Sequence, residues 1–221
     1  MALAIGNKTQ AVKTAVSPWT FLTQAHTQNT GADGFLLVAF AMDNGETFTG
    51  CTYGGQNMTL IANQNFGGLS QRLGFYGLTN PPTGNNNIIV SFNAAQFTPV
   101  SIFAVSFTGS TGIGNFASNG RSSTPNSKTL TVNSGSAIYA CGISNNGFTG
   151  IDIDGSARPL EFQHNTNKQV AGALSAVPLS AGSIDVVTKV TFSSVTNTRI
   201  EIRESTTPPP TRDNNFLIMF D

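Results

Sequence analysis

Short apolar stretches alternate with clusters of glycine, asparagine and proline along the whole chain. The stretches are rich in Val, Ile, Phe, Tyr and Thr, a pattern typical of the strands of an all-β sandwich. No long stretch has the apolar spacing of an amphipathic helix, and only one short helical turn is expected, near Ala94–Phe97. The pattern predicts strands over Ala11–Val16, Thr20–His26, Phe35–Met42, Cys51–Tyr53, Asn57–Ala62, Ser70–Tyr76, Asn87–Phe92, Val100–Thr108, Lys128–Val132, Ser136–Ile143, Leu160–Gln163, Gln169–Val177, Ser183–Phe192, Thr198–Glu204 and Phe216–Phe220.

The order of apolar and polar residues within these strands predicts which faces are buried. Ile88, Val90 and Phe92 alternate with polar residues, as expected for a strand with one face in the core. The run FLLVAFAM at Phe35–Met42 is apolar throughout, which predicts a central strand covered on both faces. Between the strands, Gly54-Gly55 predicts a two-residue hairpin turn.

The domain organisation depends on the Gly/Ser/Asn-rich segment Gly109–Asn126. A chain of 221 residues forms one large β-domain or two small ones. We interpret this segment as a long loop crossing a single sandwich, because neither half shows a closed set of strands. The expected organisation is one sandwich over residues 1–205 and an extended arm over residues 206–221.

The arm combines a polyproline spacer, Ser205–Arg212, with an apolar patch that follows it. A spacer of this kind would carry the apolar patch to a neighbouring subunit or back to the chain's own sheet. We therefore predict that the arm forms an assembly interface. Its residues would be Pro208, Pro209, Pro210, Phe216, Leu217, Ile218, Met219 and Phe220.

Charge is scarce: 10% of the residues are charged, and the formal net charge is zero. Nothing in this balance favours a nucleic acid or an anionic membrane as partner. A neutral surface is poorly protected against self-association, so it suits a subunit inside an assembly. A crowded extracellular binding module is the alternative that fits the same composition.

Side chains that carry chemistry are equally scarce. No Asp, Glu or His lies between Thr47 and Ile151, a span whose reactive side chains are Cys51 and Cys141. We expect both cysteines to be buried free thiols, with a Cys51–Cys141 disulfide as the alternative, and expect no metal or cofactor. The sequence shows no signal peptide and no apolar run long enough to span a membrane, so we expect synthesis and folding in a cytoplasm.

Three sets of polar residues have both a functional and a structural interpretation. His26 is a candidate metal or sugar ligand, but a hydrogen-bonded histidine at a strand end is the favoured interpretation. Asp152 and Asp154 in GIDIDG suggest a calcium loop, yet two carboxylates fall short of the oxygens that calcium requires, and a charged hairpin end is favoured. Glycan cleavage would need Glu161 and Asp185 to meet in one cleft, which we do not expect.

The aromatic residues offer a fourth candidate site. Trp19, Tyr53, Tyr76 and Tyr139 are candidates for a sugar-stacking platform, although packing in the core and at sheet edges is the favoured interpretation. Tyr53, beside the Gly-Gly turn, is the best candidate for a glycan contact, together with Asn57. No nucleophile-elbow motif is present, and we predict a protein that is not an enzyme.

The chain contains five sequence blocks in this order: WTFLTQAHT, FLLVAFAM, TYGGQNMTL, RLGFYGLTNPPTGNNNIIVSF and IFAVSFTG. Their order resembles a module of phage and bacterial surface proteins. The similarity covers roughly Pro18–Gly109 and implies a jelly-roll-like β-sandwich used for structure or binding, with no catalytic residues to carry over. The family often has an Asn-Arg or Asp-Arg pair where this chain has Asp33-Gly34, so no role tied to that arginine is transferred.

The resemblance implies a structural protein of a phage virion, assembled in the host cytoplasm. We expect a decoration (cement) or minor capsid protein that binds the major capsid protein or another virion protein without covalent bonds. It would be a homo-oligomer, a dimer or a trimer. The alternative is a tail-fibre or adhesin domain that binds a host glycan.

Overall fold

The computed structural model consists of strands and connecting turns, and no helix occurs among the residues that it describes. All strand pairs are antiparallel. The described residues are 2–13, 19–29, 33–43, 48–66, 71–96, 100–122, 126–144, 147–165, 169–190 and 195–206.

The first nine strands form two sheets. Sheet A has the order β1-β9-β3-β7-β6, and sheet B has the order β2-β8-β4-β5. This order is that of a jelly roll, in which most consecutive strands lie in opposite sheets and only the pairs β4–β5 and β6–β7 stay within one sheet. The strands are β1 (Ala4–Lys13), β2 (Trp19–Gln28), β3 (Phe35–Asp43), β4 (Phe48–Tyr53), β5 (Gln56–Asn57), β6 (Thr59–Phe66), β7 (Gln71–Thr79), β8 (Gly84–Gln96) and β9 (Val100–Thr108).

The last nine strands repeat this topology. Sheet C has the order β10-β18-β12-β16-β15, and sheet D has the order β11-β17-β13-β14. Adding nine to each strand number of sheets A and B reproduces both orders, so the chain contains two jelly rolls in tandem. The strands are β10 (Ser110–Ser122), β11 (Asn126–Val132), β12 (Ala137–Ser144), β13 (Phe148–Ile153), β14 (Ser156–Arg158), β15 (Phe162–Asn165), β16 (Gln169–Leu174), β17 (Gly182–Val190) and β18 (Val195–Glu204).

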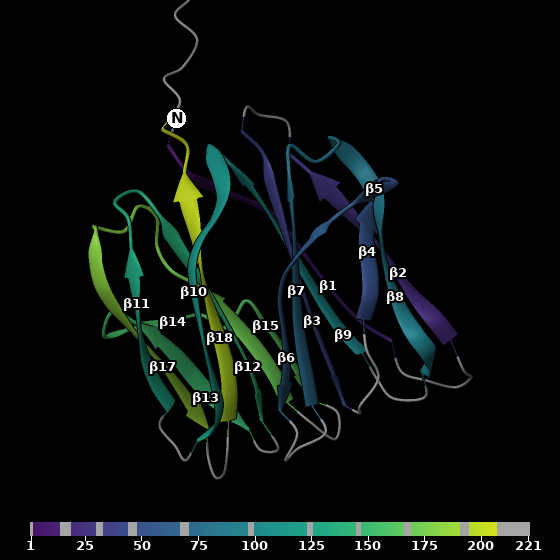
Figure 1. Ribbon diagram of the computed structural model, residues 1–221. Coiled ribbons are helices and arrows are strands. Elements are labelled where there is room, and N and C mark those ends of the chain that lie inside the picture. Colours follow the sequence, from purple (N-terminus) through teal and green to yellow (C-terminus); the bar gives the residue numbers. More distant parts are fainter. Residues whose placement is uncertain are drawn as a thin grey trace, which may run out of the picture.

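The four sheets stack in the order B, A, C, D (Figure 1). One apolar core fills the first jelly roll, and two apolar clusters fill the second. A further core lies between sheets A and C and joins the two jelly rolls. The Lys8–Glu161 ion pair, at 2.7 Å, adds a polar link between β1 and the residue before β15. The predicted all-β, jelly-roll-like antiparallel architecture is therefore confirmed, but the single sandwich expected over residues 1–205 is instead two jelly rolls packed back to back.

The inner strands are apolar throughout because each of their faces meets a different core. In β3, Phe35 and Leu37 point into the core between sheets A and C, whereas Leu36 and Val38 point into the core of the first jelly roll. This confirms the prediction that Phe35–Met42 is a central strand covered on both faces. Strand β12 is buried along its whole length in the same way.

A short sequence identity marks the repeat. Phe48–Gly50 and Phe148–Gly150 both read Phe-Thr-Gly, and β4 and β13 share the same order of buried and exposed residues. Both strands shift register beside this tripeptide, which is the signature of a β-bulge. Each is followed by a tight turn with positive φ, at Gly54-Gly55 and at Asp154-Gly155.

Further sequence-based expectations differ from the structure, and strands β13 and β14 have no counterpart among the predicted strands. Most of the expected crossing loop, Gly109–Asn126, is the edge strand β10, whose pairing with β18 shifts register three times. These bulges and the Gly/Ser/Asn composition hide the alternation by which strands are recognised. Ala94–Gln96 continues β8 instead of forming a helical turn, and the first strand begins at Ala4 rather than Ala11. The predicted strand and assembly residues of the arm lie outside the described residues.

Candidate binding surface

Sheet B has an outer face without charge. None of the four strands of this sheet contains Asp, Glu, Lys or Arg in the sequence that the structure describes. Phe21 and Ile89 stand out on this face with 54% and 37% of their surface exposed. We call it the neutral face. Its residues are Phe21, Thr23, Ala25, Thr27, Gly50, Thr52, Asn57, Asn85, Asn87, Ile89 and Ser91.

Strand register arranges these side chains in rows. The central row crosses all four strands, because Ile89 pairs with Thr23 on one side and with Thr52 on the other, and Thr52 pairs with Asn57. Residues directly opposite on neighbouring strands point to the same face. The row therefore presents hydroxyl and amide groups around one exposed isoleucine.

The corresponding face of sheet D carries charges. Asp152, Asp185 and Lys189 of this sheet stand where sheet B has Thr52, Asn87 and Ser91. The equivalence of Asn87 and Asp185 is direct, since their carbonyls accept hydrogen bonds from the backbone N–H groups of Gly54 and Asp154 in the two equivalent turns. We call the sheet D surface the charged face.

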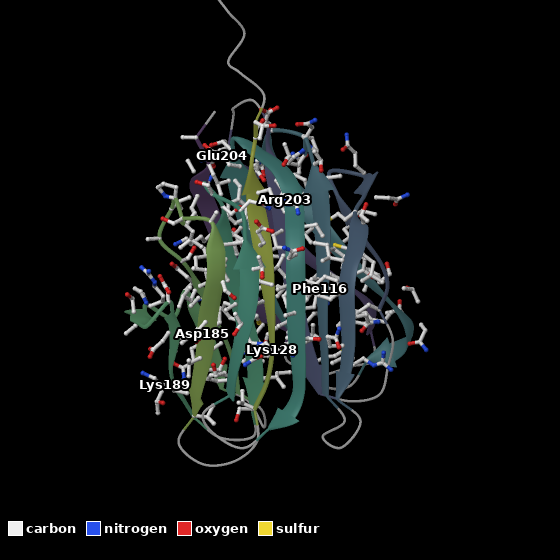
Figure 2. The ribbon with its side chains drawn as sticks, turned by 60° about the vertical axis from the view of Figure 1, so that its left-hand side comes forward. Phe116, Lys128, Asp185, Lys189, Arg203 and Glu204 are labelled. Atoms are coloured by element: carbon white, nitrogen blue, oxygen red, sulfur yellow. The ribbon has the colours of Figure 1, made fainter. Side chains whose placement is uncertain are left out.

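The polar side chains of the charged face also pair with one another. Lys189 forms an ion pair with Asp152, and the Thr129 hydroxyl donates to the Asp185 carboxylate at 2.6 Å. Figure 2 shows Asp185 and Lys189 at the solvent side of this sheet. The two jelly rolls thus have equivalent outer faces of different character. The face of sheet D carries charged side chains, whereas the face of sheet B is neutral and partly apolar.

A groove of about 620 Å³ lies beside the neutral face, between β4 and the start of β6. Its buried apolar lining includes Phe48, Met58 and Tyr76. Leu60 stands at its rim with 49% of its surface exposed. Strand β5 covers the edge of β4 only at Thr52 and Tyr53. We call this depression the β4 groove.

His26 is buried between sheets A and B and serves the fold. Its Nδ1 lies 2.9 Å from the Thr9 hydroxyl, and its Nε2 lies 3.3 Å from the Ser106 hydroxyl. Burial lowers the pKa of His26 to about 4, so the ring is neutral near pH 7. The interpretation of His26 as a hydrogen-bonded histidine agrees with this geometry, although the ring lies inside the sandwich.

The second jelly roll buries a carboxylate at the position equivalent to Ser106, the partner of His26. Glu201 accepts hydrogen bonds from the backbone N–H groups of Asn115 and Asn133 and from the Ser136 hydroxyl. Burial alone would raise the pKa of Glu201, but these hydrogen bonds hold it below its usual value. Nearby, Arg199 is fully buried and donates to the Val186 carbonyl at 3.2 Å. Burial lowers the pKa of Arg199 to about 10.

Of the two candidate glycan contacts, only Asn57 reaches the surface. Tyr53 is fully buried, and its hydroxyl donates to the carbonyls of His26 and Gly84 and accepts from the Gln28 backbone N–H. Tyr53 therefore cannot stack on a sugar, because its ring fixes the first jelly roll from within. The sequence places an aromatic residue beside the turn but does not say that β4 points it inward.

The other aromatic and thiol candidates are also buried. Tyr76 and Tyr139 belong to the apolar cores, and nothing is described of the Trp19 side chain. Cys51 and Cys141 are buried free thiols, as predicted. Burial raises the pKa of both, that of Cys141 to about 12. Both sulfurs are protonated near neutral pH.

The carboxylates named from the sequence have separate partners. Glu161 pairs with Lys8, whereas Asp185 lies on the charged face. Asp152 pairs with Lys189, and Asp154 occupies a turn with φ of 54°. Within the described residues, no group of three His, Cys, Asp or Glu side chains is placed to hold a metal ion. In the same residues there is no helix of the length and apolarity that crossing a membrane requires.

Neither the neutral face nor the β4 groove was predicted from the sequence. The signal for the first is present, since the sequences of β2, β4, β5 and β8 lack charge, but these strands are scattered and only the fold unites them. No protein-family model, curated protein or solved structure matches this chain.

Proposed function

We propose that this protein is a structural component of a phage virion, a decoration or minor capsid protein that attaches to the protein shell through its neutral face. The observation that carries the proposal is the contrast between two equivalent surfaces of one chain. The charged face has Asp152, Asp185 and Lys189 where the neutral face has Thr52, Asn87 and Ser91.

Charged residues are depleted at the centre of protein interfaces because burying them removes their hydration. Apolar side chains such as Phe21 and Ile89 are favoured there because their burial is stabilising. A sheet face with charged side chains is expected to stay exposed to solvent. A face with neutral residues at the same positions can be buried against a partner at lower cost. The resemblance of residues 18–109 to phage and bacterial surface modules supports a protein shell as that partner.

The buried polar groups support a passive role. His26 and Glu201 use their hydrogen-bonding capacity inside the two jelly rolls, and both cysteines are buried. In this proposal the protein acts through buried area and shape. Binding only to the assembled lattice, it would stabilise that lattice by mass action.

The test exchanges the charges of the two faces. One variant carries Thr52→Asp, Asn87→Asp and Ser91→Lys, which transfers the charged residues of sheet D to the equivalent positions of sheet B. The matched control carries Asp152→Thr, Asp185→Asn and Lys189→Ser on sheet D. Each variant is mixed with assembled particles that lack the protein, and co-sedimentation is measured after thermal unfolding has shown that the fold is intact.

We expect the first variant to lose co-sedimentation and the control to keep it. Equal binding by both folded variants would reject the neutral face as the attachment surface. Failure of the unmodified protein to bind any assembled particle of its phage would reject the proposed function itself.

A second candidate function is glycan binding by a tail-fibre or adhesin domain. The observation that favours it is a depression of about 390 Å³ lined by Gly54, Gly55, the three asparagines Asn85–Asn87 and Ile89. Amide side chains pair with sugar hydroxyl groups because they both donate and accept hydrogen bonds. Asn87→Ala would then abolish binding to a neutral host polysaccharide on a glycan array.

A further inference from the structure

The β4 groove has the properties of a site for an extended apolar peptide. Its lining, which includes Phe48, Met58, Leu60 and Tyr76, contains no charged residue among the described side chains. Along β4 it extends from Phe48 to Thr52, about 17 Å at the rise of a strand. Leu60 exposes half of its surface at the rim, where a bound apolar side chain would cover it.

The second jelly roll shows how the equivalent place is filled. Leu160 occupies the position of Leu60 in the repeat, ten residues after the glycine of the bulge-forming Phe-Thr-Gly tripeptide in each case. Leu160 packs against both core clusters of the second jelly roll, whereas Leu60 is exposed beside the groove. The first jelly roll thus leaves open a place that its own repeat closes with a leucine.

The chain contains a segment that fits this groove. Phe216–Phe220 reads Phe-Leu-Ile-Met-Phe, an uncharged apolar run of the same number of residues as Phe48–Thr52. It follows the described residues, which end at Thr206. Fully extended, residues 207–215 span at most about 30 Å, which sets how far from Thr206 the apolar run can bind.

We propose that the β4 groove binds the Phe216–Phe220 segment of a second copy of this chain. Pro208–Pro210 favours a stiff extended conformation, which carries the segment away from the end of β18. Thr206 follows sheet C, whereas the groove opens between sheets A and B, so a return to the same chain must turn around the edge of sheet A. The arm of a neighbouring molecule does not need to make this turn to reach the groove. This oligomer contact does not depend on the proposed attachment to a capsid.

Cysteine cross-linking between two distinguishable full-length chains tests the proposal. An affinity-tagged chain with Leu60→Cys is mixed with an untagged chain with Leu217→Cys under mild oxidation. Both chains also carry Cys51→Ala, because Cys51 lines the groove and would compete with Leu60→Cys. Cys141 is buried between sheets A and C and is left unchanged. The control replaces the tagged chain by one with Ser183→Cys, an exposed position on sheet D.

We expect a tagged–untagged heterodimer whose yield is at least tenfold higher for Leu60→Cys than for Ser183→Cys. Leu60→Arg should also weaken self-association in sedimentation velocity, whereas Ser183→Arg should not. Equal cross-linking of both tagged chains would overturn the groove as the receptor. A double variant, Leu60→Cys with Leu217→Cys, that closes only within one chain would overturn the second copy as the source. A wild-type chain that stays monomeric at every tested concentration would also overturn the binding of a second copy.

Discussion

Phe103 of β9 and Phe162 of β15 stack across the boundary between the two jelly rolls, with ring centroids 4.6 Å apart and ring planes inclined by 17°. Tyr139 stacks on Phe103 from the same side of the boundary as Phe162. Gly172 makes room for this cluster, because a Cβ atom there would lie 2.4 Å from the Phe162 ring. Stacked aromatic rings therefore join the two halves of the protein.

Truncating this stack should destabilise the whole protein. Phe162→Ala removes a buried aromatic ring and is expected to cost about 3–5 kcal/mol in the free energy of unfolding. A double-mutant cycle with Phe103→Ala should give a coupling of about 0.5–1.5 kcal/mol. Urea denaturation measures both values. The control is Phe21→Ala on the neutral face, expected within about 0.5 kcal/mol. Equal costs for Phe162→Ala and Phe21→Ala would contradict the shared core.

The buried Glu201 carboxylate should matter more than a surface ion pair. Glu201→Gln places an amide N–H₂ group against donors that now point at a carboxylate oxygen, at an expected cost of about 2–4 kcal/mol. Asp152→Asn, which breaks the surface pair with Lys189, should cost at most about 1 kcal/mol. Chemical denaturation of both variants at neutral pH checks the difference. Similar costs would show that the Glu201 network contributes no special stability.

The order of apolar and polar residues predicts those parts of the fold in which a regular strand or a glycine turn leaves a clear local pattern. The apolar run Phe35–Met42 identifies a two-sided inner strand because two different cores accept its alternate residues. The Gly54-Gly55 dipeptide identifies a tight turn because both residues adopt positive φ. Strand β10 is not recognisable in the same way, since its bulges interrupt the period of two.

The tandem repeat is nearly invisible in the sequence because structurally equivalent positions of the two jelly rolls mostly hold different types of residue. Leu37 and Tyr139 occupy equivalent inner positions, as do Ser106 and the buried Glu201. The Phe-Thr-Gly tripeptide recurs because a bulge and a buried ring are required at the same point of each jelly roll. The two binding surfaces proposed above depend on contacts between distant segments, which periodicity does not report.

The two equivalent turns offer a matched test of the repeat. Gly55 and Gly155 have φ of 79° and 70°, with open space where a Cβ atom would stand. Alanine at either position should cost about 1–2 kcal/mol through backbone strain alone. Gly50→Ala and Gly150→Ala are the controls, because they also have open space but lack positive φ. Thermal unfolding should rank each turn variant below its control, and a different rank in one half would show that the turns are not equivalent.

The two thiols should report unfolding. Cys51 and Cys141 are buried, and burial raises the pKa of both, so the reactive thiolate is scarce and shielded in the folded state. We expect negligible reaction with a thiol reagent in native buffer and labelling of both residues in denaturant. Mass spectrometry of the labelled peptides identifies each site. Rapid native labelling of Cys141 would contradict the packed boundary between sheets A and C, where it lies.

Acid should weaken the first jelly roll through His26 before it reaches the carboxylates. The pKa of His26 falls from its ordinary 6.5 to about 4 on folding because the ring is buried. Above pH 6.5 the ring is neutral in both states, so it adds no pH dependence. Between pH 6.5 and 4 the unfolded chain binds a proton that the folded chain does not, and stability falls by roughly 3 kcal/mol in total.

The measurement is the free energy of unfolding against pH for the wild type and two variants. His26→Asn should remove the slope between pH 6.5 and 4.5, since asparagine does not titrate. Glu201→Gln should keep that slope and lose the further decline at lower pH, because the folded carboxylate stays ionised below its ordinary pKa and the variant has no carboxylate there. A wild-type profile that is flat from pH 6.5 to 4.5 would show that His26 takes up its proton without opening the sandwich.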